Sequence, residues 1–394
     1  MKVAAEKGTR DEGVTSRAHR YLYCTWGYQP DEFGGAERQA KAQAEELARR
    51  RHVVTVVCPR WRGTKSSVAQ GVDVRRLRFV QHRPYTSASY SVALFWFLLK
   101  RAHHFDLIYV HHAYFQADAA VLAALIRGRP VVVKVAASGE HGEIARMKRL
   151  GWAAATRLIG LRMATRVQAT SADIEQEVIS VGVKRDRILT MPNGVDTSAF
   201  RPASPEEKRG ARARLGLPGE GLITLFVGRL ARHKGVNDLL SVWPRLKQSD
   251  SVLVLVGSRT TMDSVDPLQS SDRVIVREWS DDITQYYHAA DIFVLPSYVE
   301  GMSNAMLEAM ACGLAVVSTR VGAAECVLED GVSGRLICAG DTDQLESALR
   351  EVMGSPAARS QLGEKARSRI EVGFSLQSVV NRIETLAGEL AVRR

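Results

Sequence analysis

The chain has 394 residues, which is more than one hydrophobic core usually supports, so its length excludes a small single-core protein and predicts two domains. With 45% hydrophobic and 25% charged residues and no low-complexity tract, the composition excludes a fibrous or mainly disordered chain. The net charge is +11 for the chain and +13 for residues 1–200, where 31 Lys and Arg face 18 Asp and Glu, so this half has either an anionic partner or a basic surface that serves only solubility.

Residues 1–20 are polar and charged and lack the apolar core of a secretory signal, so we expect a flexible basic tail there. From Tyr21, short apolar runs alternate with helical patterns, which is typical of parallel βαβ units. The pattern predicts a doubly wound α/β domain over 21–200. Its expected strands are 21–25, 53–58, 107–110, 131–135, 166–170 and 188–191, and its expected helices include 35–51 and 117–126.

One expected helix, 85–100, contains the most apolar run of the chain, residues 92–99. This run is less than half the roughly 20 residues that a membrane-spanning helix needs, so no transmembrane helix is expected. The helix either packs inside the domain or holds the domain against an anionic membrane. The basic residues that precede it are Arg75, Arg76, Arg78 and Arg83.

The strand pattern breaks at residues 192–196, and a segment rich in Pro, Gly and charge follows. A second α/β domain is therefore expected over 201–374. A last helix, 376–390, falls in a C-terminal segment, 375–394, that can pack back on the first domain. The expected strands of the second domain are 222–228, 251–257, 273–277, 292–296, 315–319 and 334–337.

Five cysteines occur without CxxC or Cys/His spacing, and this odd number favours neither a disulfide framework nor a zinc site. We therefore expect a cytoplasmic protein without a metal site or another bound cofactor.

Two segments that follow strands of the second domain carry the residue types that hold a diphosphate. Arg229 and Lys234 come directly after strand 222–228, and ligands of doubly wound sheets bind beyond the carboxyl ends of the strands. Their charges can neutralise a diphosphate without a metal ion. After strand 292–296, Ser303 or Asn304 can cap a helix whose N-terminus attracts anions.

These residues belong to three groups that occur in order along the second half of the chain. The groups are Gly228-Arg229-Leu230 with Lys234-Gly235; Pro296-Ser297 with Glu300-Gly301 and residues 308–313; and Gly322, Glu325, Asp330-Gly331 and Gly334. With them the chain resembles the retaining family-4 glycosyltransferases (glycosyl transferases group 1), whose GT-B fold has two Rossmann-like domains that face each other across a cleft. In the first half, residues 33–37 and 192–200 resemble two further segments of that family.

The resemblance implies an enzyme that moves a hexose from a nucleotide sugar, with UDP or GDP as the expected nucleotide, and retains the anomeric configuration. It implies a glycan, lipid-linked or small-molecule acceptor in envelope or exopolysaccharide synthesis, at the inner face of the cell membrane, and no nucleic acid partner. In this chain Arg229 and Lys234 would hold the diphosphate, Glu308 the ribose and Glu300 a sugar hydroxyl. Further donor contacts would be Gly34, Gly35, Gly257, Gly301, Met302, Ser303 and Asn304.

The first domain is implied to supply the acceptor side of the site. His111 follows a strand where the family carries its histidine, and with Glu300 it is the expected catalytic residue; the neighbouring His112 is the weaker candidate. Ser138, Glu140 and His141 would shape the acceptor pocket. This loop departs from the family, since many relatives have a His-Gly pair there, and Glu278-Trp279 also stands where relatives often have glycine.

Other functions are weighed by their own sequence requirements. A nicotinamide oxidoreductase needs G-x-G-x-x-G after a strand, and the chain has no such string. The Asp-x-Asp at residues 341–343, which a metal-dependent transferase would need, fits a helix N-cap better. A GT-B epimerase or phosphorylase, or a sugar-nucleotide-binding protein without turnover, stays open because these share the fold.

Overall fold

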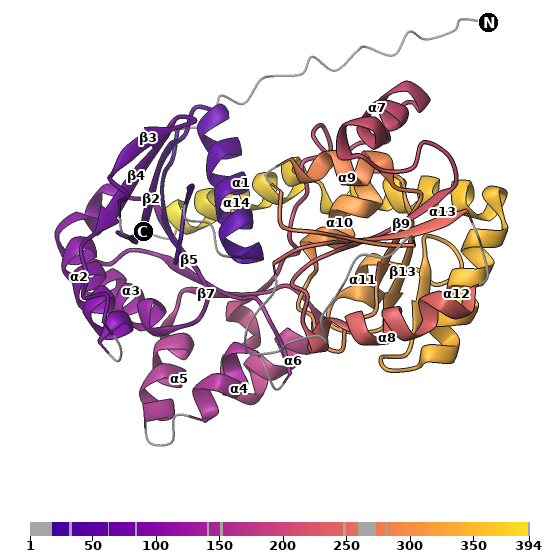
Figure 1. Cartoon of the computed structure of the whole chain (residues 1–394). Helices are drawn as coiled ribbons and strands as arrows, with labels where there is room; N and C mark the ends of the chain where they lie inside the picture. The colour runs from indigo at the N-terminus through magenta and orange to yellow at the C-terminus, as the bar shows by residue number, and fades with distance from the viewer. Residues whose placement is uncertain are drawn as a thin grey trace, which may run out of the picture.

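The computed structural model describes residues 18–30, 34–61, 63–82, 85–139, 142–149, 153–246, 250–258, 273–280 and 282–392. The backbone forms two α/β units, each built on a mainly parallel sheet, which confirms the predicted class of two Rossmann-like domains (Figure 1). We name them the N-terminal and C-terminal domains. Most of the expected tail, residues 1–17, lies outside the described residues.

The sheet of the N-terminal domain has the order β3-β4-β2-β1-β5-β6-β7-β8, and every pair is parallel except β3 with β4. The expected strands are present to within one or two residues at their ends, whereas β3 and β4 were not expected. Buried and more exposed residues alternate along β4. Its charged residues interrupt the continuous apolar run that is typical of a central parallel strand. The strands are β1 Arg20–Cys24, β2 Val53–Pro59, β3 Ser67–Ala69, β4 Val72–Leu77, β5 Leu107–His111, β6 Val131–Val135, β7 Arg166–Ala169 and β8 Ile188–Thr190.

Helices cover both faces of this sheet. One face packs against α2 (Thr86–Arg101), α3 (Phe115–Ile126), α5 (Ala153–Met163) and α6 (Ala172–Ser180), and the short α4 (Glu143–Lys148) lies beside α5. The opposite face packs against α1 (Gly35–Arg49) and the last helix of the chain, α14 (Leu376–Val392). The N-terminal sheet is therefore completed by a helix from the far end of the sequence.

The C-terminal domain has a six-stranded parallel sheet in the order β11-β10-β9-β12-β13-β14. The sequence order reverses between β9 and β12, which is where ligands of such sheets bind. Its strands are β9 Leu222–Val227, β10 Ser251–Val256, β11 Val274–Arg277, β12 Ile292–Leu295, β13 Ala315–Thr319 and β14 Arg335–Ile337; its helices are α7 Pro205–Leu215, α8 Val236–Val242, α9 Ile283–Ala289, α10 Asn304–Ala311, α11 Ala324–Val327, α12 Thr342–Gly354 and α13 Pro356–Arg369. Asp341 caps α12 by accepting from the Gln344 backbone N–H at 2.9 Å, so the Asp-x-Asp is a helix N-cap as predicted.

The chain crosses between the domains twice, and the two crossings lie side by side. The Val195 backbone N–H donates to Phe374 O at 2.9 Å, and the Leu376 N–H donates to Val195 O at 2.8 Å. The second crossing leads into α14, which Figure 1 shows in yellow as it runs back to the N-terminal domain.

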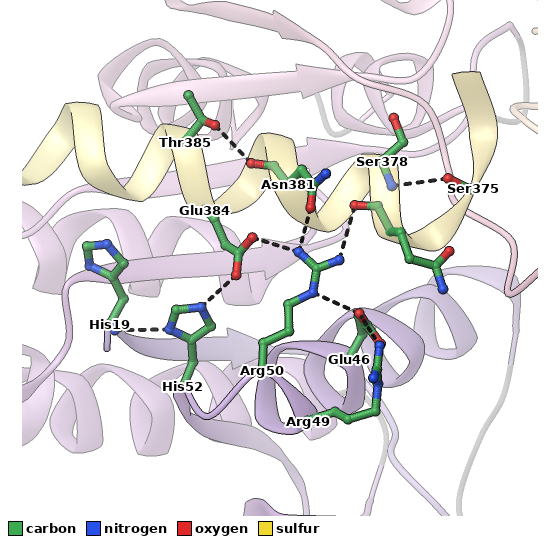
Figure 2. A network of polar contacts seen from close by, with 11 residues as sticks. His19, Glu46, Arg49, Arg50, His52, Ser375, Ser378, Asn381, Glu384 and Thr385 are labelled. Carbon is green, nitrogen blue, oxygen red and sulfur yellow. Dashed lines mark hydrogen bonds and ion pairs between the residues drawn. The ribbon is translucent and has the colours of Figure 1, made fainter. Parts of the chain in front are cut away.

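A polar network fixes α14 on the N-terminal domain (Figure 2). The Arg50 guanidinium donates to Glu384 at 2.7 Å and Asn381 at 2.5 Å on α14, and to Glu46 at 2.8 Å on α1. His52 contacts the second Glu384 oxygen through Nε2 at 2.7 Å, while its Nδ1 accepts from the His19 backbone N–H. Glu384 is thus compensated by two partners from the N-terminal domain.

Candidate active site

The carboxyl ends of β9 and β10 lie in close contact at the edge where a donor is expected. Gly257 follows β10 with φ of +157°, and a Cβ atom there would lie 1.7 Å from the Gly228 carbonyl oxygen, directly after β9. Glycine is therefore required for this close approach of two backbones. The segments that follow β9 and β10 are therefore in direct backbone contact at this edge of the sheet.

The two predicted cations of the donor site have different surroundings. Lys234 lies 2.7 Å from Glu300 Oε1, which also accepts from Ser297 Oγ at 2.8 Å. Arg229 is exposed, and its guanidinium has no hydrogen-bond or ion-pair partner among the described residues. One positive charge is therefore held in place beside a carboxylate, and the second is available to an anion.

Residues 301–304 lead into α10 as predicted. Ser303 caps the helix, because its Oγ accepts from the Met306 backbone N–H at 3.3 Å. Asn304 turns toward the N-terminal domain: its Nδ2 donates to Gly35 O at 2.9 Å. The helix N-terminus thus lies against the start of α1, which contains the predicted glycine pair.

Glu308 lies one turn further along α10 and is buried. Tyr287 Oη donates to its Oε2 at 2.7 Å, and Arg38 Nη2 from α1 lies 3.7 Å from its Oε1. Burial raises the pKa of Glu308, although Arg38 and Tyr287 oppose this shift. The Arg38 guanidinium also lies 4.5 Å from the centre of the Trp279 ring, so it connects α1 to the segments that carry Glu308 and Trp279.

Further hydrogen bonds join the domains at Asn193, in the predicted 192–200 segment. Its Nδ2 donates to Met302 O at 3.1 Å and Asn304 Oδ1 at 2.9 Å, and its Oδ1 accepts from Lys134 Nζ at 2.6 Å. Lys134 is 1% exposed, and this burial lowers its pKa to about 7. Asn193 therefore connects the buried end of β6 to residues 301–304, which we name the donor segment.

Gly301 contacts the N-terminal domain directly through its backbone. It forms an antiparallel bridge with Ala137, and a Cβ atom at residue 301 would lie 1.9 Å from Ala136 O. The loop after β6 and the donor segment therefore approach as closely as two backbones can.

His111 is the last residue of β5 and is fully buried. Its ring packs against Tyr23 and Tyr109, with centroids 5.4 and 5.3 Å away, and neither ring nitrogen has a hydrogen-bond partner among the described atoms. Burial, followed by the charge of Lys134, lowers the pKa of His111 well below its usual value, so the ring is neutral. Its catalytic role stays a prediction.

His112 lies beside it with different surroundings. Its φ of +81° is unusual for a residue with a side chain. Nε2 lies 3.4 Å from Glu37 on α1, and Nδ1 lies 3.3 Å from Glu143 on α4. Burial alone would lower the pKa of His112, but hydrogen bonds and the charges of both carboxylates raise it to about 9. A charged imidazole is therefore held between two carboxylates.

Glu143 also shapes the predicted acceptor loop. Its carboxylate accepts from the Ala136 and Ala137 backbone N–H groups at 3.1 and 2.8 Å. Ser138 in this loop is buried, whereas the other predicted acceptor residues, Glu140 and His141, lie outside the described residues.

The structure thus brings most predicted donor residues together and adds partners that sequence reasoning missed. Arg38 follows the glycine pair by one helical turn, so its spacing is the signal that could have identified it. Lys134, His112 and Glu143 have no such signal, because the fold alone unites them. Within the part of the chain that the structure describes, no three His, Cys, Asp or Glu side chains gather as metal ligands, and no helix is long and apolar enough to cross a membrane.

Two family models match the chain. Residues 33–199 match the model of Glycosyltransferase Family 4, and residues 221–355 match that of Glycosyl transferases group 1.

Named relatives extend this likeness. An alpha-maltose-1-phosphate synthase of Mycolicibacterium smegmatis is 30% identical over 294 residues, which cover 67% of this chain and 74% of the relative. A D-inositol 3-phosphate glycosyltransferase of Acidothermus cellulolyticus is 34% identical over 214 residues, but the match covers only 50% of this chain and 47% of that protein. The chain therefore matches only about half the length of this second relative.

Solved structures share the fold. HepE of Anabaena, in complex with UDP and glucose, has a TM-score of 0.76 at 20% identity, and the match covers 94% of this chain and 99% of HepE. A sucrose-phosphate synthase of Thermosynechococcus elongatus has a TM-score of 0.75 at 20% identity, over 95% of this chain and all of that protein.

Proposed function

Because this chain belongs to the group 1, or family 4, glycosyltransferases, we propose that it transfers a hexose from a nucleoside diphosphate sugar to a hydroxyl group with retention of anomeric configuration. The acceptor is a glycan, a lipid-linked sugar or a small molecule of cell-envelope or exopolysaccharide synthesis. The enzyme works in the cytoplasm, at the inner face of the membrane, and needs no metal ion.

One observation carries this proposal: the carboxyl edge of the C-terminal sheet combines Arg229, the Lys234–Glu300 pair and the capped N-terminus of α10. Fixed cations and oriented N–H groups stabilise the negative charge that grows on a departing diphosphate. Glu300 and Glu308 accept hydrogen bonds from sugar and ribose hydroxyls.

The mechanism follows from the position of this edge against the N-terminal domain. The Gly301–Ala137 bridge and the Asn193 contacts join the two domains at residues 301–304, and closure of the domains around the donor is proposed to expel water. The acceptor oxygen attacks the face of the anomeric carbon that the diphosphate leaves, and the departing phosphate takes the acceptor proton. His111, which is buried and neutral at the carboxyl end of β5, is proposed to face the reacting carbon and the acceptor hydroxyl.

A panel of UDP- and GDP-sugars tests the proposal, with donor hydrolysis or transfer as the readout in the presence and absence of a chelator. We expect turnover of one donor class that the chelator leaves unchanged. Proton NMR of the product gives its anomeric configuration, and an inverted product would contradict the mechanism. Phosphate-dependent cleavage of a glycan would identify a phosphorylase instead.

We also propose that α2, α3 and α5 dock on an anionic membrane. These helices lie side by side, and α2 buries Leu94 and Leu98 while it exposes Val92 and Trp96. The apolar run is therefore partly core and partly surface. Exposed basic side chains lie nearby at Lys100, Arg101, Arg127 and Arg162, which favours anionic lipid. Seven exposed apolar side chains of the three helices form what we name the apolar face: Val92, Trp96, Leu122, Leu125, Ile126, Ile159 and Met163.

Vesicle sedimentation tests this surface. We expect the chain to bind phosphatidylglycerol vesicles at low salt, and the double substitution Val92→Ser with Trp96→Ser to weaken binding about 10-fold, because each side chain loses apolar contact. Val372→Ser is the matched control, since Val372 is 85% exposed in the other domain. Equal binding by all three proteins would exclude the apolar face.

A further inference from the structure

A second basic feature of the N-terminal domain has no role in the donor site. It is a hollow of about 270 Å³ beyond the carboxyl ends of β2 and β4, close to the start of α2. We name it the basic hollow. Its lining residues are Arg60, Trp61, Gly63, Arg78, Phe79 and Gln81.

The wall of the basic hollow is aromatic and held in place. The Trp61 ring packs edge-to-face against Phe79 and Trp26, with centroids 5.0 and 5.7 Å away, and Trp61 Nε1 donates to Trp26 O at 3.2 Å. Trp26 in turn packs against the buried Tyr90 of α2. These contacts fix the rings, which can pack against the apolar face of a sugar ring at little cost in side-chain entropy.

The arginines near this wall differ in their partners. Arg75 is exposed and paired with Asp73 at 2.8 Å, and Arg76 is buried, where it donates to Tyr28 O and Gln29 O at 3.0 and 2.5 Å. Arg76 is therefore structural and forms no part of the basic surface that the sequence predicted, while Arg83 lies outside the described residues.

Arg60 and Arg78 are the arginines whose charge remains available in the basic hollow. Arg60 uses Nε to donate to Thr64 O at 3.0 Å, and no carboxylate in the described part of the chain pairs with either guanidinium. Two guanidinium groups that no described carboxylate neutralises, beside aromatic rings, suit a phosphate group, which arginine can bind through two parallel hydrogen bonds.

The position of the basic hollow relates it to the acceptor. The order β4-β2-β1-β5 places it on the same edge of the sheet as His112, which follows β5. With strands about 4.8 Å apart, β2 and β4 end about 10 to 15 Å from β5. A ligand in the basic hollow can therefore extend to the region between the domains, where the reacting hydroxyl is expected.

We propose that the basic hollow binds a phosphate-bearing sugar unit of the acceptor, distant from the hydroxyl that reacts. Arg60 and Arg78 bind the phosphate, and Trp61 and Phe79 contact the ring. The proposal rests on the proposed function, because it assigns the ligand to the acceptor. It defines the acceptor as an anionic sugar compound longer than one unit.

Ligand-observed NMR with the full chain tests binding apart from turnover. We titrate glucose 1-phosphate and, as the uncharged comparison, methyl α-glucoside. We expect saturable binding of glucose 1-phosphate alone, and Arg60→Gln and Arg78→Gln each to raise its Kd at least about 10-fold through loss of charge-assisted hydrogen bonds. Arg75 lies on β4, which ends just before Arg78. Arg75→Gln removes an equal charge outside the basic hollow and is expected to leave the Kd unchanged.

Two comparisons separate this site from other anion sites. Lys234→Ala disrupts the donor site, so retained glucose 1-phosphate binding in that variant supports the basic hollow, and lost binding overturns it. A wild-type chain without any donor hydrolysis or transfer would contradict the proposed function, while the binding test would still stand. If Arg75→Gln raised the Kd as much as Arg78→Gln, the proposal would also be overturned. Binding of phosphatidic acid vesicles without binding of glucose 1-phosphate would overturn it too, because the ligand would then be a lipid phosphate and not a sugar phosphate.

Discussion

The donor edge of the C-terminal domain and the facing edge of the N-terminal domain are assembled in different ways. On the donor side, one strand, turn and helix are consecutive in residues 292–311, and Arg229 and Lys234 come from the segment after β9. On the facing side, Glu37 from α1, His112 after β5 and Glu143 on α4 meet through the fold.

Charge compensation differs as well. The three ions of the His112 cluster neutralise one another in part, so they hold loops in position. Among the described residues, no carboxylate pairs with Arg229 at the donor edge or with Arg60 and Arg78 in the basic hollow. The difference separates charges that maintain structure from charges that are available to a ligand, and each prediction below tests one side of it.

The largest effect is expected at the donor edge. Lys234→Ala and Glu308→Ala should each lower kcat/KM by about 10²- to 10³-fold, because each removes a fixed partner of the nucleotide sugar. Steady-state kinetics with the active donor measures this. Lys208→Ala is the control. Lys208 Nζ lies 2.5 Å from Asp291 Oδ1, outside the donor segment, so this substitution should leave turnover intact. Unchanged turnover in both site variants would contradict the site map.

A smaller loss is expected where the two edges touch. In Gly301→Ala the new Cβ atom would lie 1.9 Å from Ala136 O, so the loop and the donor segment must separate. We expect kcat to fall roughly 10- to 10²-fold through misplacement of the reacting groups. Gly354→Ala is the control, because a Cβ atom at Gly354 meets nothing within 4 Å. Wild-type kcat in Gly301→Ala would show that the bridge is not needed for turnover.

The same difference in assembly decides how much the sequence predicts. Buried parallel strands are continuous apolar runs, so their order along the chain and the two-domain fold are predictable. The strand, glycine turn and capped helix around residues 296–308 are local in sequence, and their geometry is predictable too.

The N-terminal side is less predictable because its partners are distant in sequence. Glu143 lies 31 residues from His112 yet contacts it at 3.3 Å, and periodicity gives no indication of such a pair. The arginines near β4 show the same limit. Arg75, Arg76 and Arg78 look equivalent in the sequence, but only tertiary contacts separate the paired, buried and available side chains.

A third effect concerns the stability of the facing edge. The pKa of His112 is raised to about 9, above the roughly 6.5 of an unfolded chain, so its charge stabilises the fold fully below about pH 6.5 and this contribution is lost as the pH rises through about 9. We expect the difference in unfolding free energy between wild type and His112→Gln to shrink by on the order of 1–3 kcal/mol between pH 6.5 and 10.

Chemical denaturation at each pH measures that difference. The buried Lys134, whose pKa is lowered to about 7, titrates within the same pH range in both proteins, so its contribution cancels in the comparison. A difference that stays constant with pH would show that Glu37 and Glu143 do not hold a charged imidazole.

The smallest effect is expected where α14 contacts the N-terminal domain, far from either set of available charges. Arg50→Ala removes hydrogen bonds to Glu46, Asn381 and Glu384, and leaves Glu384 with His52 alone (Figure 2). We expect a loss of about 1–2 kcal/mol in unfolding free energy, with KM unchanged. Arg49→Ala is the matched control: Arg49 is 69% exposed and, among the described residues, pairs with Glu46 of the same helix, so a loss below about 0.5 kcal/mol is expected. Equal losses in both variants would mean that the contact across the chain contributes no more than a surface pair, and that apolar packing alone holds α14 in place.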